Sequence, residues 1–428
     1  MKTQISYKNE LSDFLLISVV SPAFGLWKLF QARSERFVVT GSVLMMGLFG
    51  ALFAYPEDSD GYTHYIRSLK YYTWMDLDKF LNESWNILTQ HPTLESTDLY
   101  IHVLYFLSNS VLGIPRSLHF FAGLALGYFI SKSLLLVLGK DLKKIKLNSG
   151  LLVFMVLLLV HTVYSLNAIR TNTAMWVMFY GVSGFYLKRQ WKFLLFIILA
   201  TQIHMAYLVI AIPAILGFFL ANRKWITILI WLISFYQQVS FEGISSYLPE
   251  TEAVENKTKV YVLDKQRMDE FQDHKQSLSG NWYSSWGPNL YYGWGLTIAV
   301  IGVILVYIKS KTGFLNYLIG TSLLYYSSAN MVLFSPSLQG RLINHVSMFV
   351  VFAMLYYSSS IAYKLKGGFR NFTFKFSSLL FFLISIPFLL KNVSHIINTT
   401  DVFFLSGPFL ALFTDEKISI RNLIGNLL

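Results

Sequence analysis

The chain has no cysteine and few charged residues. None of its 428 residues is Cys, and only 14% are Asp, Glu, Lys or Arg, where soluble proteins carry about 25%. The first absence excludes disulfides, cysteine nucleophiles and cysteine-ligated metals. The second excludes the charged surface of an ordinary soluble protein. Hydrophobic residues make up 54% of the chain instead, and this composition indicates a membrane protein.

The hydrophobic residues gather in runs long enough to cross a bilayer, which takes about 20 residues. Such runs must be helical, because lipid offers no hydrogen-bond partner to backbone N–H and C=O groups. They include Phe37–Ala54, Leu118–Leu138, Gly150–Leu166 and Ser377–Leu390. We therefore expect an all-α polytopic membrane protein, one integral membrane domain over residues 1–428. It should have about ten transmembrane helices and roughly two or three re-entrant or interfacial half-helices.

The net charge of +12 would suit nucleic acid, but the distribution of the cations indicates another cause. They lie in short clusters between the apolar runs, as on the cytoplasmic side of membrane proteins. The clusters are Arg33/Arg36, Lys140/Lys143/Lys144/Lys146, Lys188/Arg189/Lys192, Arg223/Lys224, Lys309/Lys311 and Lys364/Lys366/Arg370. We therefore expect no nucleic-acid partner. The N-terminal stretch lacks a small-residue cleavage site, so we also expect no cleavable signal peptide.

Placing every cluster in the cytoplasm predicts the path of the chain. Residues 55–98 and 241–288 become two large external loops, and both termini lie outside. The predicted crossings are Leu11–Phe30, Phe37–Tyr55, Leu118–Leu138, Gly150–Leu166, Ala168–Leu187, Trp225–Ser240, 289–308, 314–333, 341–363 and 375–391. Leu99–Ile114 and Val402–Phe413 are expected to be re-entrant or interfacial.

Segment Phe193–Leu220 admits two interpretations. Its 28 residues are too many for one untilted span and too few for two. A hairpin of two half-helices with His204 near its tip keeps Arg223/Lys224 in the cytoplasm. A single long span would place that cluster outside and invert everything after it. We favour the hairpin.

Three ionisable residues stand in or beside predicted spans, where such residues are costly and usually functional. Arg170 and Arg341 each open an inward span near the outer face, and His204 is reachable from that side. A helix N-terminus favours an anion, and guanidinium groups bind phosphate oxygens bidentately. The two arginines are therefore candidates for a phosphate or pyrophosphate site. The alternatives are that they reach for the interface or pair with a loop carboxylate, and that His204 is a hydrogen-bonded core histidine.

The first external loop has the residues of a sugar site. Asp60 can accept a hydroxyl proton, and Tyr62 and Tyr65 offer rings on which a pyranose can stack, with Arg67 beside them. Asp58-Ser59-Asp60 is also a possible divalent-metal triplet, but that pattern is short and common, so we predict no metal. Leu69–Leu88 is expected to be an amphipathic helix on the membrane surface.

The second external loop turns aromatic at its end, around Trp286. These rings are typical of a membrane-interface belt, of a glycan platform, or of both. Four other histidines are expected to be structural: His102, His119, His161 and His345. The chain contains no Walker A loop, no GxGxxG after a strand, no HExxH and no GxSxG, so nucleotide chemistry and hydrolase nucleophiles are not supported.

Taken together, these residues resemble the EpsG/Wzy-type polysaccharide polymerase family. The resemblance is densest from 150 to 215: Asn167-Ala-Ile-Arg170, a returning span, a basic turn, then an apolar hairpin with His204 and Pro213. Asp60-Gly-Tyr62 and Arg341 follow the order of the family. The chain departs from it at Thr171, where Gln is common, and at Ser96-Thr97-Asp98, where Glu-Pro is common.

The resemblance implies a glycosyltransferase, similar to the GT-C type, that polymerises lipid-linked oligosaccharide at the outer face of the bacterial inner membrane. It would join undecaprenyl-pyrophosphate-linked repeat units into O-antigen, capsule or exopolysaccharide, without a cofactor. Arg170 and Arg341 would bind pyrophosphate, Asp60 or His204 would be the base, and Tyr62, Tyr65, Arg67, Asn167 and Trp286 would contact glycan. Partners would be membrane lipid, a chain-length regulator and a flippase. The alternatives are a flippase of the same glycans, for which repeat symmetry is missing, and an O-acyltransferase.

Overall fold

The computed structural model describes residues 2–55, 59–89, 91–94, 98–139, 149–161, 166–236, 281–361, 369–412 and 418–427. Within these ranges the chain is helical, and the only strand-like pairs are two isolated bridges, Phe53 with Thr400 and Asp401 with Ser419. The predictions for Asp58, residues 241–280 and the clusters at 140–146 and 364–366 lie outside the described residues.

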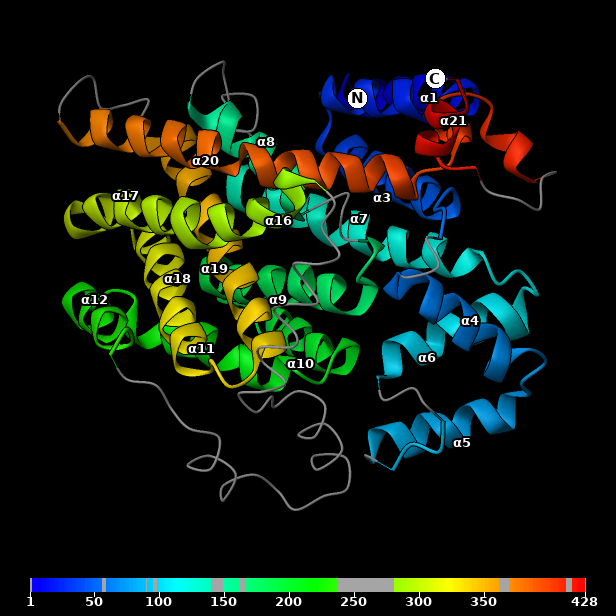
Figure 1. The fold of residues 1–428 in the computed structure, drawn as a ribbon, viewed down its shortest axis with the longest axis horizontal. Helices are drawn as coiled ribbons and strands as arrows, with labels where there is room; N and C mark the ends of the chain where they lie inside the picture. The colour runs from blue at the N-terminus through cyan, green and yellow to red at the C-terminus, as the bar shows by residue number, and fades with distance from the viewer. Residues whose placement is uncertain are drawn as a thin grey trace.

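Figure 1 shows the arrangement of the helices. In chain order they are α1 (Lys2–Val20), α2 (Pro22–Phe30), α3 (Glu35–Ala51), α4 (Asp60–Tyr72), α5 (Leu77–Leu88), α6 (Leu99–Tyr105), η1 (Phe106–Val111), α7 (Ser117–Leu138), α8 (Ser149–His161), α9 (Ile169–Lys188), α10 (Lys192–Ile203), α11 (Tyr207–Leu220), α12 (Lys224–Ile233), α16 (Trp282–Asn289), η4 (Leu290–Gly295), α17 (Leu296–Lys309), α18 (Gly313–Met331), α19 (Pro336–Tyr356), η5 (Tyr357–Ile361), α20 (Phe369–Thr399), η6 (Val402–Phe404), η7 (Pro408–Leu412) and α21 (Ile420–Leu427).

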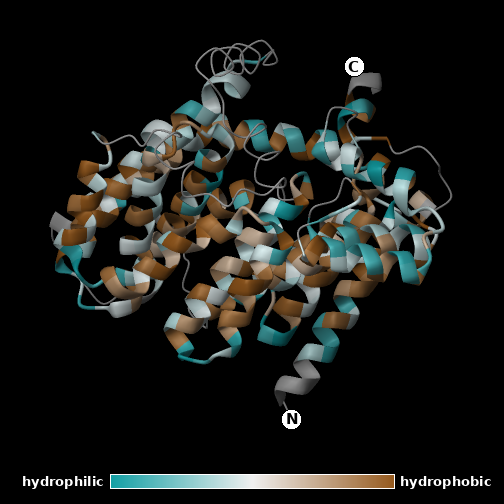
Figure 2. Cartoon of the chain, turned by 90° about the horizontal axis from the view of Figure 1, so that it is seen from below, coloured by the Kyte–Doolittle hydropathy of each residue, from teal (hydrophilic) through white to brown (hydrophobic). Residues whose placement is uncertain are grey.

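The protein is an all-α membrane protein. In the described part of the chain, four helices are long and apolar enough to span a bilayer: Ser117–Leu138, Trp282–Lys309, Pro336–Ser359 and Asn371–Thr399. Hydrophobic residues run along most of the helices, and hydrophilic residues gather at several turns (Figure 2). Large apolar side chains also stay exposed on α10 to α12, with Ile198 58%, Ile212 52% and Leu229 56% exposed. Such a surface suits lipid rather than water.

Several basic turns lie together at one end of the bundle. Lys224 donates hydrogen bonds to the carbonyl oxygens of Ile308 (3.1 Å) and Ser310 (2.5 Å), so the start of α12 closes the end of α17. The ring of Tyr186, beside Lys188 and Arg189, stacks on Tyr317 at 4.4 Å. The turns after α9, α11 and α17 are therefore neighbours. We call this end, which contains Lys188, Lys224 and Lys309, the basic end. We call the opposite end, where α9 begins and where Asp98 pairs with Arg170, the acidic-pair end.

The hairpin predicted for Phe193–Leu220 is present. Helix α10 ends at Ile203, His204 is extended (φ −155°, ψ 114°), and α11 begins at Tyr207. The α11 ring of Phe218 lies 5.3 Å from Phe185 near the end of α9, and Phe193 at the start of α10 packs on Tyr180 at 5.4 Å. Both outer ends of the hairpin thus lie near the basic end, which excludes the single long span.

The predicted crossing Leu11–Phe30 is wrong, because the chain reverses at Ser21. Lys28 pairs with Asp13 at 3.1 Å, whereas one straight helix would hold these residues about 22 Å apart. Glu10 accepts hydrogen bonds from the backbone N–H groups of Arg33 (2.7 Å) and Ser34 (3.1 Å). Helices α1 and α2 therefore form a hairpin, and Glu10 lies on the same side as Arg33.

The close packing of this hairpin depends on Gly25. A Cβ added there would lie 2.0 Å from the Ser18 hydroxyl oxygen, so only glycine lets α2 approach α1 this closely. Ser21 caps α2 from the turn and Pro22 occupies its first position. That is the usual arrangement at a helix start, and it ends α1.

The first external loop contains two helices rather than one over Leu69–Leu88. Helix α4 ends at Tyr72, Trp74 has a positive φ of 64°, and α5 starts at Leu77 after Asp76, whose side chain accepts from the Lys79 N–H. Positive φ is uncommon for a bulky residue and marks the break.

Two other predicted segments differ in detail. Leu99–Ile114 forms α6 and the π-helical η1, and at 13 residues (Leu99–Val111) it is too short to span, as expected. Val402–Phe413 is not a membrane half-helix in its described part, but two short 3₁₀ turns held by the Asp401–Ser419 bridge. The helix of the span predicted at 289–308 begins earlier, at Trp282.

Candidate functional site

Asp98 is the centre of a polar cluster at the acidic-pair end. Its Oδ2 lies 2.7 Å from Nη1 of Arg170 in the first turn of α9, and its Oδ1 accepts from the Met205 N–H at 3.2 Å. The same Oδ2 lies 3.5 Å from Nδ1 of His204. The Asp98 residue is 3% exposed. One buried carboxylate thus ties the start of α9 to the tip of the α10–α11 hairpin.

Opposing effects set the charge of Asp98. Burial by itself would raise the pKa of this carboxyl, but hydrogen bonding and the charges of His204 and Arg170 outweigh burial and hold the pKa below its ordinary value. Asp98 is therefore ionised at neutral pH. A buried charge of this kind persists only when it is paired and hydrogen-bonded.

His204 sits where the hairpin reverses. The break in the helix at Ile203 turns its side chain toward Asp98, and it is 6% exposed. Nδ1 of His204 lies 3.5 Å from the Asp98 carboxylate without forming a hydrogen bond, and a carboxylate on that side favours the tautomer that leaves Nε2 free to accept a proton. The geometry therefore suits a general base.

Asp60 opens α4 beside this cluster. Its Oδ2 lies 3.5 Å from Nε2 of His64, and its side chain is 48% exposed. The other ring nitrogen of His64 is 2.5 Å from the Tyr105 hydroxyl. Burial opposes the charge of Asp60, but His64, Arg170 and Arg67 together lower its pKa. Asp60 is an ionised, partly exposed carboxylate within the electrostatic field of Arg170.

Two guanidinium groups border one small cavity between α4, α6 and α9. Arg67 and Arg170 line it together with His64, Tyr71 and Tyr105. Sequence reasoning placed Arg170 beside Arg341 and assigned Arg67 to glycan. In the fold, the arginine that shares a cavity with Arg170 is Arg67. Neighbouring cations favour an anion between them.

Arg341 also lies near His204. It lies on α19, close enough for its charge to act on His204 and Tyr207. Its carbonyl oxygen is 2.8 Å from Nδ1 of His345, and the rings of His345 and Tyr207 are 5.4 Å apart. The Tyr207 hydroxyl donates to the Thr171 carbonyl at 2.8 Å. Arg341 thus belongs to the surroundings of His204, whereas Arg67 and Arg170 form the pair.

The remaining predicted glycan residues fall into different surroundings. Tyr65 stacks on Tyr55 at 5.0 Å, and Tyr62 lies 6.4 Å from Tyr65. Asn167 precedes α9 with its buried Oδ1 unpartnered among the described residues. Trp286 is 65% exposed on α16, which packs on α20, and no described contact links it to the cluster.

Three members of the cluster were not assigned roles from the sequence: Asp98, His64 and Tyr105. Asp98 carried one signal, since it is the lone acid directly before the apolar segment 99–114. In the searched part of the chain, no group of three or more His, Asp or Glu residues has the arrangement to hold a metal ion. Asp58, the first acid of the predicted triplet, lies outside the described residues.

The chain matches no protein-family model, no curated protein and no solved structure. The family suggested by the sequence therefore stays a prediction. Function must be argued from the site itself, because a fold alone does not imply an activity.

Proposed function

We propose that this protein is a polymerase of lipid-linked oligosaccharides, which joins repeat units carried on undecaprenyl pyrophosphate at the outer face of a bacterial inner membrane. The observation that carries the proposal is the cluster of Arg170, Asp98 and His204 at the end of α9 opposite Lys188. By helical rise, Arg170 and Lys188 are about 27 Å apart. Basic turns favour the cytoplasm, so the cluster belongs to the outer side.

The cavity between Arg170 and Arg67, of about 10 Å³, has room for little more than one water molecule, so the pyrophosphate would lie at its mouth, against the exposed parts of these two side chains. A guanidinium has five N–H donors, so the hydrogen bond from Arg170 to Asp98 leaves others for a ligand. Asp98 and the partly exposed Asp60 offset part of the charge of Arg170 and Arg67, so the two guanidinium groups would act mainly through their directed N–H donors. Such fixed donors stabilise the charge that develops on a leaving pyrophosphate.

The transfer step is a substitution at the anomeric carbon. The hydroxyl oxygen of one repeat unit forms a glycosidic bond to that carbon, and the bond from the carbon to the pyrophosphate oxygen breaks. The hydroxyl proton passes to Nε2 of His204, and undecaprenyl pyrophosphate leaves with the bonding electron pair. Asp98 holds His204 in the accepting tautomer. Asp60 is the alternative base, and Arg341 adds positive charge near His204.

The topology proposed for this function is that of a multi-pass protein with about nine crossings, because the α1–α2 hairpin replaces the first predicted span. Helices α3, α7, α8, α9, α12, α17, α18, α19 and α20 would cross, and the α10–α11 hairpin would enter from the cytoplasm. The partners would be membrane lipid, a chain-length regulator and a flippase. No cofactor is required by the step above.

The direct test is reconstitution of the purified protein with a lipid-linked repeat unit. A ladder of products carrying increasing numbers of units is expected from the wild type. Arg170→Ala and Arg67→Ala should each reduce chain growth at least about 100-fold, the loss typical of one lost electrostatic donor. Lys309→Ala, an exposed cation at the basic end, should match the wild type.

Three outcomes would count against the proposal. Wild-type ladders from both Arg170→Ala and Arg67→Ala would remove the pyrophosphate site. A larger loss from Arg341→Ala than from Arg67→Ala would restore the pairing predicted from sequence. Movement of the intact lipid-linked unit across the membrane without chain growth would favour the flippase.

A further inference from the structure

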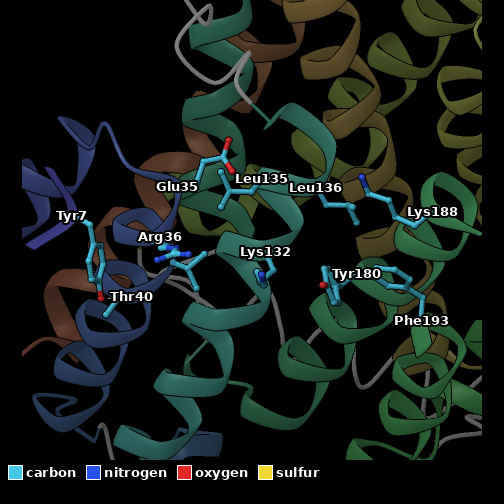
Figure 3. A pocket seen from close by; sticks show the side chains of 11 residues that line it. Tyr7, Glu35, Arg36, Thr40, Lys132, Leu135, Leu136, Tyr180, Lys188 and Phe193 are labelled. Atoms are coloured by element: carbon cyan, nitrogen blue, oxygen red, sulfur yellow. Dashed lines mark hydrogen bonds between the residues drawn. The ribbon is translucent and has the colours of Figure 1, made fainter. Parts of the chain in front are cut away.

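A second site lies at the basic end, far from the cluster. A cavity of about 690 Å³ opens between α1, α3, α7, α9 and α10. Figure 3 shows side chains from these helices around it, with Arg36 and Lys132 near its middle and Lys188 at one side. Its size is within the range of about 300–1,000 Å³ for ligand pockets.

Three cations from three different helices border this cavity, and among the described residues the only acid that lines it is Glu35. Among the described residues, Arg36 and Lys188 have no ionic or hydrogen-bonded partner. The Lys132 ammonium has only a ring beneath it, that of Tyr128 at 5.8 Å. The cavity therefore has an excess of positive charge that the described part of the protein does not neutralise.

Lys132 makes this charge unusual. It is half-buried and lies within Ser117–Leu138, one of the helices able to span the membrane, six residues before the end of α7. An ionisable residue inside a span is costly and usually has a partner or a ligand. By helical rise it is about 9 Å from the helix end, so its side chain can reach the headgroup region.

The rest of the wall is apolar. Leu135 and Leu136 follow Lys132 on α7, and Phe193 lines the cavity from α10, beside Tyr180 (Figure 3). A soluble anion would leave this apolar surface uncovered. A ligand with a phosphate and a hydrocarbon chain would satisfy both parts of the cavity.

We propose that this cavity binds an anionic phospholipid from the inner leaflet, with its phosphate between Arg36, Lys132 and Lys188 and an acyl chain along Leu135, Leu136 and Phe193. Basic pockets between membrane helices on the cytoplasmic side are known to hold anionic headgroups. The site is independent of the proposed polymerase activity, because it uses the other end of the bundle and none of the cluster residues.

The test uses the full chain in nanodiscs that contain phosphatidylcholine with or without phosphatidylglycerol. Lipid retained after transfer to detergent is counted by native mass spectrometry. The triple variant Arg36→Gln/Lys132→Gln/Lys188→Gln is compared with Arg33→Gln/Lys309→Gln/Lys311→Gln. The second triple removes three exposed cations at the same end that do not line the cavity. Unfolding temperatures equal to that of the wild type establish that both triple variants fold. If the first triple variant does not fold, the single variant Lys132→Gln takes its place.

The wild type and the second triple should retain phosphatidylglycerol in preference to phosphatidylcholine. In the first triple, the ratio of retained phosphatidylglycerol to phosphatidylcholine should fall at least about tenfold. In Lys132→Gln it should fall about fivefold, because each cation near the membrane surface contributes roughly 1 kcal/mol to the binding of an anionic lipid. Equal loss in both triples would mean a general surface attraction and overturn the site. Unchanged retention in the first triple would also overturn it. Added glycerol phosphate should not displace the lipid. If it did so at a concentration equal to that of the lipid, the ligand of this cavity would be a soluble phosphate compound and the lipid proposal would be overturned.

Discussion

Asp98 and Arg170 stand 72 positions apart in the chain and form a charge-assisted hydrogen bond of 2.7 Å. The carboxylate side chain is 2% exposed and the guanidinium side chain 24%. Such a pair fixes the start of α9 against the segment that leads into α6. Because Asp98 also accepts from Met205, the pair positions the hairpin tip that carries His204.

The energetic weight of this pair can be measured with a double-mutant cycle. Asp98→Ala should lower the free energy of unfolding by about 3–5 kcal/mol, because it leaves a partly buried charge unpaired. The double variant with Arg170→Ala should cost less than the sum of the two single changes. Chemical unfolding in detergent, monitored by tryptophan fluorescence, gives the free energy of unfolding of the wild type, the two single variants and the double variant.

The pair between Asp13 and Lys28 serves as a matched control. Its side chains are 54% and 29% exposed, so its coupling should stay below about 1 kcal/mol. Additive effects of Asp98→Ala and Arg170→Ala would show that the two residues do not interact in solution.

The identity of the base can be decided by comparing two conservative changes. His204→Gln should lower the rate of chain growth about 10²- to 10⁴-fold, the usual contribution of a general base. Asp60→Asn removes the charge but keeps the size of the side chain, and should lower the rate less than tenfold, about 1.4 kcal/mol. Initial rates with the lipid-linked unit at saturation give the comparison. A reversed order would make Asp60 the base.

The packing of α4 should weaken in mild acid because of His64. Burial, the largest effect, lowers the pKa of His64, although the Asp60 carboxylate, 3.5 Å from Nε2, opposes it. An unfolded α4 binds a proton below the ordinary value of about 6.5, whereas the folded one does not, so stability falls as the pH falls through that value. Asp60, with a lowered pKa, loses its contribution only below about 3.9. Between pH 6.5 and 5 the groups that act on α4 are therefore His64 and His102, which hydrogen-bonds Tyr72 and whose pKa burial also lowers.

Hydrogen exchange of the α4 amides measures this effect. Exchange rates, corrected for their intrinsic pH dependence, should rise relative to those of α18 between pH 7 and pH 5. His64→Gln, which cannot titrate, should reduce the change, His102→Gln should reduce the remainder, and Tyr105→Phe should keep it. Identical pH profiles in the wild type and His64→Gln would show that another group is responsible.

The absence of cysteine allows the topology to be tested with single introduced cysteines. Thr73→Cys, between α4 and α5, should react with an impermeant maleimide in intact cells. Lys309→Cys and Lys8→Cys should react only after the membrane is opened, since the α1–α2 hairpin brings Glu10 to Arg33. Labelling of Lys8→Cys in intact cells would restore the single inward crossing of Leu11–Phe30.

The sequence predicted the hairpin break better than the N-terminal one. The 28 residues between two basic clusters are too many for one untilted span and too few for two, and keeping Arg223/Lys224 in the cytoplasm favoured a reversal near His204. Leu11–Phe30, in contrast, has the length of a normal span. Its reversal depends on Gly25 meeting Ser18 and on Glu10 accepting the amides after α2, which are contacts between segments.

The sequence by itself indicated the solvent and the helical class, and it predicted the sidedness of the cations. These follow from composition and from local runs, because lipid requires every backbone group to be paired within its own helix. Tertiary structure decided which charges meet. Arg170 could have paired with any carboxylate or with a ligand, and its choice of Asp98, with Arg67 across the cavity, depends on how α4, α6 and α9 pack. Electrostatic energy depends on distance in space, and separation along the chain does not reveal that distance.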